Sequence, residues 1–497
     1  MSKNPTYTKL FEELRRLDKL SAIDGILGWD HQVNLPKNSV DFRAETAAVF
    51  SELRHRESTR PEIGEWIAEL TEADNLSPDE KVVVAQAKKD YDLSTKLPVD
   101  FVKRRAIAES EGYHTWSDAR EKNDYGSYAP YIEKHVALCK EMASYMGREN
   151  DAYDFLVDQY DPGMDCETID SLFTPLREEL VPIVQQIVNS DVKADTSFLK
   201  GFDVEKQQKF LYEVVKALGL DLGTARIDSS IHPFCGGHTC DTRLTTRFDA
   251  DNPMDSLFSV IHETGHALYQ QGLPAEFTGT ALGEAAGMAV HESQSRTWEN
   301  QIARSKGFWE YWEPKYRDLF KEQLKDISSD KFYLAANKVA LTTIRTDADE
   351  VTYNLHIMLR YELEKRLFSG ELTAKDLPEA WNTLFEASFG FKPKDDREGV
   401  LQDVHWSEGM FGYFPSYCLG NLLSAQLWYA MQKDLTSVDA DFSRGEFKEV
   451  LSWMRNHVHA NAQRFKTKEL CHIATGENFT HKYLIRYLKE RYLPLYS

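Results

Sequence analysis

A segment in the middle of the chain places two histidines on one face of a predicted helix. Asn252 is a favourable N-cap, Pro253 suits the first helical position, and Gly272 is a plausible stop. The segment between them is therefore predicted to form a helix of about five turns. On this helix His262 and His266 lie one turn apart on the same side. The fold must therefore direct both imidazoles toward the same neighbouring element or ligand.

Two imidazoles at this spacing can bind one zinc ion. Glu263 follows the first histidine directly and can reach a water molecule bound to the metal. The pattern His-Glu-x-x-His is typical of zinc peptidases, although two histidines on one helix face can also form an ordinary polar surface. The segment therefore predicts a metal site with Glu263 as general base.

A catalytic zinc site usually has three protein ligands. Glu292 follows His266 by 26 residues, which leaves room for one turn and one returning helix. His291 is the adjacent alternative, but neighbours on a helix point about 100° apart, so only one of the two can face the metal. Two histidines and one glutamate form a standard hydrolytic set, so Glu292 is predicted as the third ligand, with a supporting or packing role left for His291.

The composition excludes several classes of partner. The chain has 497 residues, 42% of them hydrophobic, with 59 basic and 80 acidic side chains and a net charge of −21. An acidic surface repels phosphate backbones and anionic lipid, so no nucleic acid and no membrane partner is expected. No apolar run is long enough to span a membrane. The six cysteines are few and scattered, which favours reduced thiols and a cytoplasmic location.

Helical periodicity dominates the remaining sequence. The two clearest stripes are Leu10, Leu14, Leu17 and Leu20, and then Val351, Leu355, Leu359, Leu363 and Leu367, which ends before Gly370. Strand signals are rare, and the best is the threonine-rich segment 241–248. No repeat or linker divides the chain. We therefore predict a mainly α protein, one domain over residues 1–497, with a small β element near its middle.

Several blocks of the sequence resemble those of the M32 family of metallocarboxypeptidases, the thermostable or Taq-type carboxypeptidases. These blocks are WDHQVNLP (29–36), HPF (232–234), DTRLT (241–245), HETGH (262–266), HESQSR (291–296), IRTDADEVTY (344–353) and GVLQDVHW (399–406). Their order and their spread over nearly the whole chain carry the resemblance. One mild departure is His31, which stands where a less basic residue is expected and for which we predict a surface or packing role.

The resemblance implies a single large helical fold with a deep central groove and a small β-sheet beside the metal-binding helix. It also implies a homodimer. The implied activity is metal-dependent removal of single residues from peptide C-termini with broad specificity. One divalent ion per chain is expected. Zinc is the first choice, and cobalt and manganese also tolerate such ligands.

A carboxypeptidase must also recognise the free terminal carboxylate of its peptide substrate. Arginine does this best, through a bidentate pair of hydrogen bonds. Within the resembling blocks, Arg345 and Arg243 are the predicted substrate-binding arginines. The alternative is that either forms a structural ion pair with an aspartate nearby in sequence. The candidates are Asp241, Asp347 and Asp349.

His405 and Tyr413 are predicted to contact the substrate as well. Each carries a polar group that can stabilise the oxyanion of the reaction, and each can instead be a core aromatic residue whose polar atom has a partner.

Two other functions are alternatives to the carboxypeptidase. A zinc oligopeptidase would cut inside peptides and tolerate a blocked C-terminus. A non-catalytic helical binding protein would keep only a vestigial site, which the complete ligand set and Glu263 argue against.

Overall fold

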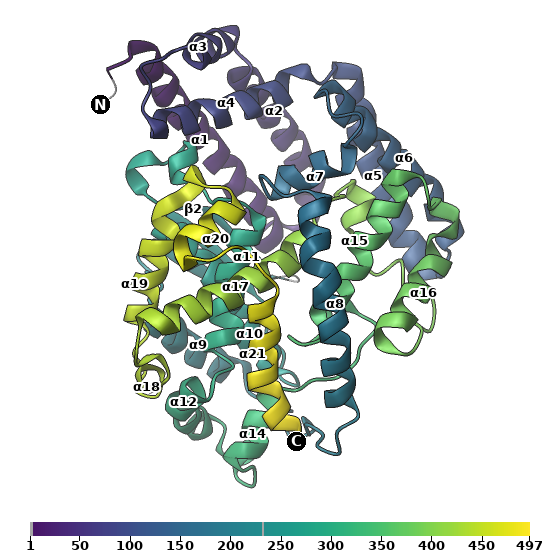
Figure 1. Cartoon of the computed structure of the whole chain (residues 1–497), viewed down its shortest axis with the longest axis vertical. Coiled ribbons are helices and arrows are strands. Elements are labelled where there is room, and N and C mark those ends of the chain that lie inside the picture. The colour runs from purple at the N-terminus through teal and green to yellow at the C-terminus, as the bar shows by residue number, and fades with distance from the viewer. Residues whose placement is uncertain (1–2, 231–232) are drawn as a thin grey trace. The chain divides into compact units, whose positions relative to one another are not determined.

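The computed structural model describes residues 3–230 and 233–497, so His232 of the HPF block lies outside the described residues. Helices make up most of the chain, and one small sheet accompanies them, as the sequence predicts (Figure 1). The chain divides into two compact units, each made of three segments. Unit 1 contains residues 1–95, 195–336 and 427–477, and unit 2 contains residues 96–194, 337–426 and 478–497. The single domain predicted over residues 1–497 stays a prediction.

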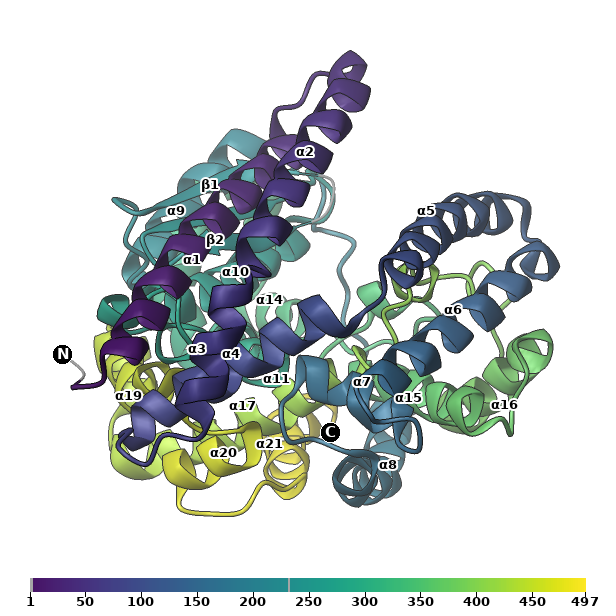
Figure 2. The ribbon, with the colours of Figure 1, turned by 90° about the horizontal axis from the view of Figure 1, so that it is seen from above.

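Unit 1 carries the sheet and the predicted metal-binding segment. Its helices are α1 (Pro5–Val33), α2 (Val40–Ser58), α3 (Pro61–Thr71), α4 (Pro78–Lys96, to residue 95), α9 (Val204–Leu218), α10 (Pro253–Gly272), α11 (Met288–Arg296), α12 (Lys306–Leu319), α13 (Lys321–Leu324), α14 (Ser329–Ala336), α18 (Val438–Phe442), α19 (Lys448–His457) and α20 (Thr467–Thr475). Helices α1 and α2 pack against each other (Figure 2). A π-helical segment, Thr297–Ile302, continues directly from α11.

Unit 2 contains three of the four predicted substrate-binding residues, Arg345, His405 and Tyr413, whereas Arg243 lies in unit 1. Its helices are α5 (Val99–Lys122), α6 (Tyr125–Tyr145), α7 (Ala152–Tyr160), α8 (Cys166–Val188), α15 (Tyr353–Ser369), α16 (Leu377–Phe389), the first part of α17 (Pro415–Asp434) and α21 (Lys482–Tyr492). The predicted glycine stop of α15 is confirmed, since Gly370 adopts a left-handed conformation with φ 82°. Two 3-10 turns, Arg345–Asp347 and His405–Glu408, carry predicted site residues.

The sheet has three strands in the order β1–β3–β2. The strands are β1 (Ala225–Ser229), β2 (Cys235–His238) and β3 (Asp241–Thr246). The central strand β3 pairs in parallel with β1 and antiparallel with β2. The predicted threonine-rich strand is β3, whereas no local pattern indicated the two shorter strands. Helix α10 packs on this sheet through contacts with β3 and β2.

Helix α10 forms as predicted. Pro253 is its first residue and Asn252 takes the N-cap position, although the asparagine side chain makes no capping hydrogen bond. Most of the helix is buried between the sheet, α9 and α11, and Ile261 and Leu268 are fully buried. No helix among residues 3–230 and 233–497 is both long enough and apolar enough to cross a membrane.

The contact between α10 and α11 depends on a glycine within the HETGH block. A Cβ atom on Gly265 would lie 2.5 Å from Ser295 Cα and 2.8 Å from the Gln294 carbonyl oxygen. Both are backbone atoms of α11, which cannot move aside as a flexible side chain can. The absence of a side chain at Gly265 therefore allows α11 to approach the helix that carries the two histidines.

We expect Gly265→Ala to separate α10 from α11. Overpacking of this kind lowers the free energy of unfolding by about 1–3 kcal/mol. Gly25→Ala in α1 is the matched control, because a Cβ there meets no atom within 4 Å. Replacing an exposed helical glycine by alanine raises the free energy of unfolding by about 0.5–1 kcal/mol. Thermal unfolding checks both variants, and an unchanged Gly265→Ala protein would contradict the close contact.

Candidate metal centre

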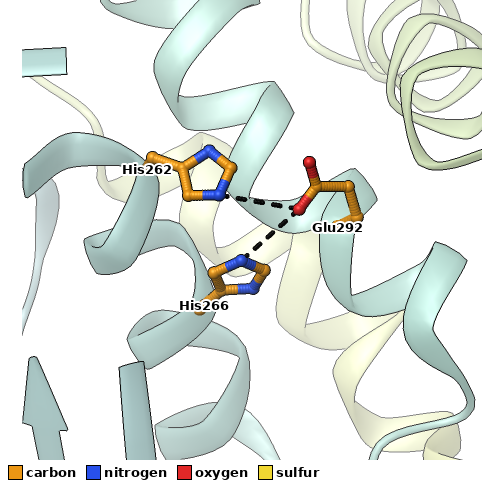
Figure 3. A group of neighbouring side chains, drawn as sticks. All are labelled: His262, His266 and Glu292. Atoms are coloured by element: carbon orange, nitrogen blue, oxygen red, sulfur yellow. Dashed lines mark ion pairs between the residues drawn. The ribbon is translucent and has the colours of Figure 1, made fainter. Parts of the chain in front are cut away.

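Three side chains of unit 1 converge as the sequence predicts. His262 and His266 come from α10, and Glu292 comes from the facing helix α11 (Figure 3). The Glu292 Oε2 atom lies 3.6 Å from His262 Nε2 and 3.5 Å from His266 Nε2. Two atoms each about 2.1 Å from a tetrahedral zinc ion are separated by roughly 3.4 Å. The three donors therefore fit one such ion, and their chemistry is that of a hydrolytic metal site.

The His262 ring is oriented by a carboxylate on the π-helical segment. His262 Nδ1 lies 2.9 Å from Glu299 Oε2, so the ring can donate its Nδ1 proton there and leave Nε2 facing Glu292. Glu299 is held in turn by Arg304 at 3.2 Å and Arg296 at 3.3 Å. Metal-binding histidines commonly donate their second ring N–H to a carboxylate, which fixes the tautomer and the ring plane.

The His266 ring is oriented by His291, the residue that the sequence offered as the alternative third ligand. His266 Nδ1 lies 2.6 Å from His291 Nδ1, so one ring donates a proton and the other accepts it. Burial, together with the neighbouring His266, lowers the pKa of His291 to about 3, which keeps this ring neutral. His291 thus has the supporting position that the sequence left open for it, and Glu292 takes the position facing both Nε2 atoms.

Glu292 is fixed in its charged form by its own helix. Arg296 Nε donates to Glu292 Oε1 at 2.6 Å, and Ser295 Oγ donates to Oε2 at 3.0 Å. Burial opposes ionisation of this carboxyl group, but Arg296 and His262 outweigh it and hold its pKa well below the usual range. The arrangement therefore presents one ionised oxygen to the two imidazoles.

Glu263 follows His262 on α10, and burial has a different net effect on its carboxyl group than on that of Glu292. Its side chain is 7% exposed. Burial raises the pKa of its carboxyl group, while His262 and His266 act in the opposite direction. A buried carboxylate with a raised pKa has a stronger tendency to accept a proton, which is the property that a general base requires.

Arg243 lies on β3, where its guanidinium group is already paired. Its Nε and Nη2 atoms donate to the two oxygens of Asp241, each at 2.9 Å. The same guanidinium stacks over the Trp29 ring of α1, 4.4 Å from the centroid. This is the bidentate aspartate pair that the sequence analysis named as the alternative to substrate binding.

Arg345 of unit 2 is buried and shares an aspartate with a second arginine. Arg345 Nε donates to Asp403 Oδ1 at 2.9 Å, and Arg360 Nε donates to Asp403 Oδ2 at 2.6 Å. Burial opposes the charge on Asp403, but the two guanidinium groups hold its pKa well below the usual range. The partner of Arg345 is thus not one of the aspartates near it in sequence. Two cations around one anion leave a net positive charge in this cluster.

His405 and Tyr413 lie near this cluster within unit 2. Their rings are 5.5 Å apart, and the His405 ring is 4.6 Å from that of Phe414. Burial lowers the pKa of His405 to about 4, with Asp403 acting in the opposite direction. The imidazole is therefore neutral near pH 7, and its buried Nδ1 atom has no hydrogen-bond partner among the described residues.

Sequence reasoning missed the charged residues that hold the ligands. Helical spacing places Arg296 and Glu299 four and seven residues after Glu292, on the same face, and this signal was available. Asp403 stands inside the GVLQDVHW block. Arg360 lies within a helix that is buried on all sides, and nothing local in the sequence distinguishes it.

The donor set and its supporting carboxylate define a metallopeptidase type of site, and comparison with known proteins agrees. Residues 9–492 match the model of the carboxypeptidase Taq (M32) metallopeptidase family. The chain is 39% identical to thermostable carboxypeptidase 1 of Thermus thermophilus, with 100% of both chains covered. It is also 39% identical to carboxypeptidase 1 of Bacillus subtilis, with 99% of both covered.

A solved structure of an M32 carboxypeptidase from Deinococcus radiodurans R1 is also similar, with a TM-score of 0.96 and 36% identity over 99% of this chain and 100% of that one. The chain belongs to the M32 family. It is a metal-dependent carboxypeptidase, as its sequence motifs predict.

We expect the purified protein to bind about one divalent ion per chain. Glu292→Ala removes the anionic donor and should abolish stoichiometric binding. Glu299→Gln removes only the support of His262 and should weaken binding by about 10–100-fold. His31→Ala, on the exposed side of α1, is the control that should bind as the unaltered protein does. Elemental analysis and chelator titration give these values, and full occupancy of Glu292→Ala would refute the ligand set.

Proposed function

We propose that this carboxypeptidase acts at the centre formed by His262, His266 and Glu292, with one divalent ion, zinc first among the candidates. The observation that supports the proposal is the convergence of three donor atoms, with each histidine Nε2 atom within 3.6 Å of the ionised Glu292 Oε2 atom. Zinc suits two nitrogens and one oxygen, and cobalt or manganese also tolerates them. When bound, the ion would supply Lewis-acid polarisation of the scissile carbonyl and a lowered pKa for water.

The protein's own contribution to proton transfer is assigned to Glu263. Its carboxylate accepts a proton from the attacking water and later delivers it to the leaving amine nitrogen, first as a base and then as an acid. Burial favours both steps, because it raises the pKa of the group toward the working range of the reaction. Glu299 and His291 keep the two ligand rings in a single orientation while this happens.

Glu263→Gln is expected to keep the shape of the site and to remove the proton acceptor. Metal content should stay near that of the unaltered protein, while turnover should fall by about 10²–10⁴-fold. Elemental analysis and release of free amino acid from an unblocked peptide measure the two quantities on the same sample. Turnover of the unaltered enzyme in a metal-loaded Glu263→Gln protein would mean that another group is the base.

We assign recognition of the terminal carboxylate to Arg345, with Arg243 as the second candidate. Arg345 belongs to a cluster whose two guanidinium groups exceed its one carboxylate, so an incoming anion would complete the charge balance. Arg243 is the weaker candidate, because its charge is matched by the single carboxylate of Asp241, which binds the Nε and Nη2 edge of the guanidinium group. His405 and Tyr413 are proposed to contact the substrate, with His405 as a neutral hydrogen-bond donor to the developing oxyanion.

Arg345→Ala tests this assignment by comparing two substrates. A charge-assisted hydrogen bond contributes about 1.5–3 kcal/mol, so kcat/KM for a peptide with a free C-terminus should fall about 10–100-fold. The same peptide with an amidated C-terminus is already a poor substrate and should change little. An equal loss on both would indicate a structural role through Asp403, and no loss on either would direct attention to Arg243→Ala. Good turnover of amidated peptides by the unaltered enzyme would favour an oligopeptidase.

We further propose a homodimer and a cytoplasmic location. The dimer rests on family resemblance, and light scattering should give a mass near twice 57.2 kDa. A monomer at micromolar concentration would exclude it and leave the enzymatic proposal intact. The location is supported by six cysteines that are all unpaired in the structure, which suits a reducing compartment. Fractionation of cells that express the protein would test the compartment.

A further inference from the structure

An irregular segment of unit 2, residues 403–413, carries both His405 and Tyr413. It consists of a short 3-10 turn, which begins at His405, and of loops on either side. Gly409 and Gly412 adopt left-handed conformations with φ 69° and 82°. Glycines of this kind give the backbone many alternative conformations, so contacts from neighbouring elements must select one of them.

Glu364 of α15 binds this segment at two points. Its Oε1 atom accepts a hydrogen bond from Trp406 Nε1 at 2.6 Å, and its Oε2 atom accepts one from the Gly412 backbone N–H at 2.9 Å. Trp406 directly follows His405 in the sequence, and Gly412 directly precedes Tyr413. The two oxygens of one carboxylate therefore hold the segment next to each of the two proposed substrate-binding residues.

The Glu364 carboxylate is completely buried and has a third donor. Glu364 is 0% exposed, and the Tyr153 hydroxyl of α7 donates to its Oε2 atom at 2.7 Å. An ionised carboxylate accepts from all three donors, whereas an amide in its place would turn N–H groups toward them. Burial raises the pKa of Glu364 to about 7, with the three hydrogen bonds acting in the opposite direction. Above this pH the charged group matches its surroundings, and a buried network with satisfied partners specifies one arrangement.

The position of the His405 ring depends on the backbone that Glu364 holds. The buried Nδ1 atom of this ring has no hydrogen-bond partner in the described part of the chain, and the ring packs 4.6 Å from that of Phe414. One turn before Glu364 on α15, Arg360 binds Asp403, two residues before His405. Helix α15 therefore fixes the chain on both sides of His405 rather than the imidazole itself.

We propose that Glu364 is a positioning residue for hydrolysis of the peptide bond. By binding the segment 403–413 at two points, it sets where His405 and Tyr413 meet the substrate. A displacement of about 1 Å at a reacting group can cost about 10²-fold in rate. The oxyanion forms only in the transition state, so loss of this positioning should lower kcat and leave KM nearly unchanged. The proposal rests on the substrate contact proposed above for His405.

The first experiment breaks the contact from each side and is read above the pKa of Glu364 of about 7. Glu364→Gln replaces one acceptor oxygen by an NH₂ group, and Trp406→Phe keeps an aromatic ring without its donor. Each should lower kcat about 10–100-fold with KM within about twofold. The double variant should be no slower than the slower single variant, because both changes remove one contact. Unchanged kcat in both single variants, or losses that multiply fully in the double variant, would overturn the proposal.

Two controls belong to this comparison. Glu362→Gln changes a partly exposed carboxylate on the same helix, 3.9 Å from Lys365, and should keep the kcat of the unaltered enzyme. Metal content should stay the same in every variant, because the proposed ligands belong to unit 1. A loss of metal in Glu364→Gln that accounts for its lost turnover would overturn the positioning role.

The second experiment separates positioning from a purely structural role. Tyr153→Phe removes the third hydrogen bond to Glu364 and leaves both contacts with the segment 403–413. Its melting temperature should fall about as much as that of Trp406→Phe, since each loses one buried hydrogen bond, but its kcat should stay within about twofold. Equal losses of kcat in these two variants would mean that Glu364 only stabilises unit 2. If melting shows that Glu364→Gln is unfolded, this pair decides.

His405→Phe tests the contact on which the inference rests. It keeps an aromatic ring against Phe414 and removes the proposed donor, so kcat should fall about 10²–10³-fold. This loss together with an unchanged kcat in Glu364→Gln would overturn the positioning role alone. An unchanged kcat in His405→Phe would overturn the substrate contact of His405 and, with it, the role of Glu364.

Discussion

The salt bridge between Arg296 and Glu292 is the interaction on which the metal centre depends. Glu292 lies in the interior, where an ionised carboxylate is costly unless a cation compensates it. Arg296 lies one turn further along the same helix and supplies this compensation on Oε1, which leaves Oε2 for the two imidazoles. The anionic donor is thus prepared by its own helix, and α10 has only to bring the histidines to it.

Charges around the centre alternate in sign. Arg304 and Arg296 pair with Glu299, Glu299 orients His262, and Arg296 also pairs with Glu292. Each group reduces the cost of burying the next, so loss of one member would leave a buried charge without its partner. The cluster in unit 2 follows the same principle with opposite balance, because Asp403 joins Arg345 to Arg360.

Local patterns in the sequence predicted the parts of this structure that are themselves local. The HETGH spacing predicted that His262 and His266 share a face, and the count of residues to Glu292 predicted a returning helix. The pairing of Arg345 with Asp403 could not be predicted in this way, since the two are 58 residues apart and the aspartates nearer in sequence were the natural alternatives. The edge strand β2 escaped detection because CGGH has neither β-branched residues nor alternation.

The π-helical segment after α11 determines which side chains beside the metal centre point in the same direction. Glu299 and Arg304 are five residues apart, a separation that an α-helix directs about 140° away from each other, yet they form an ion pair here. The wider winding, with Ala303 N bonded to the Trp298 carbonyl oxygen, brings them to the same side. With ordinary α-helical winding over the same residues, Arg304 would point away from Glu299 and this ion pair would be lost. The ion pair between Arg304 and Glu299, which supports the carboxylate that orients His262, therefore depends on the winding of the backbone as well as on the side chains.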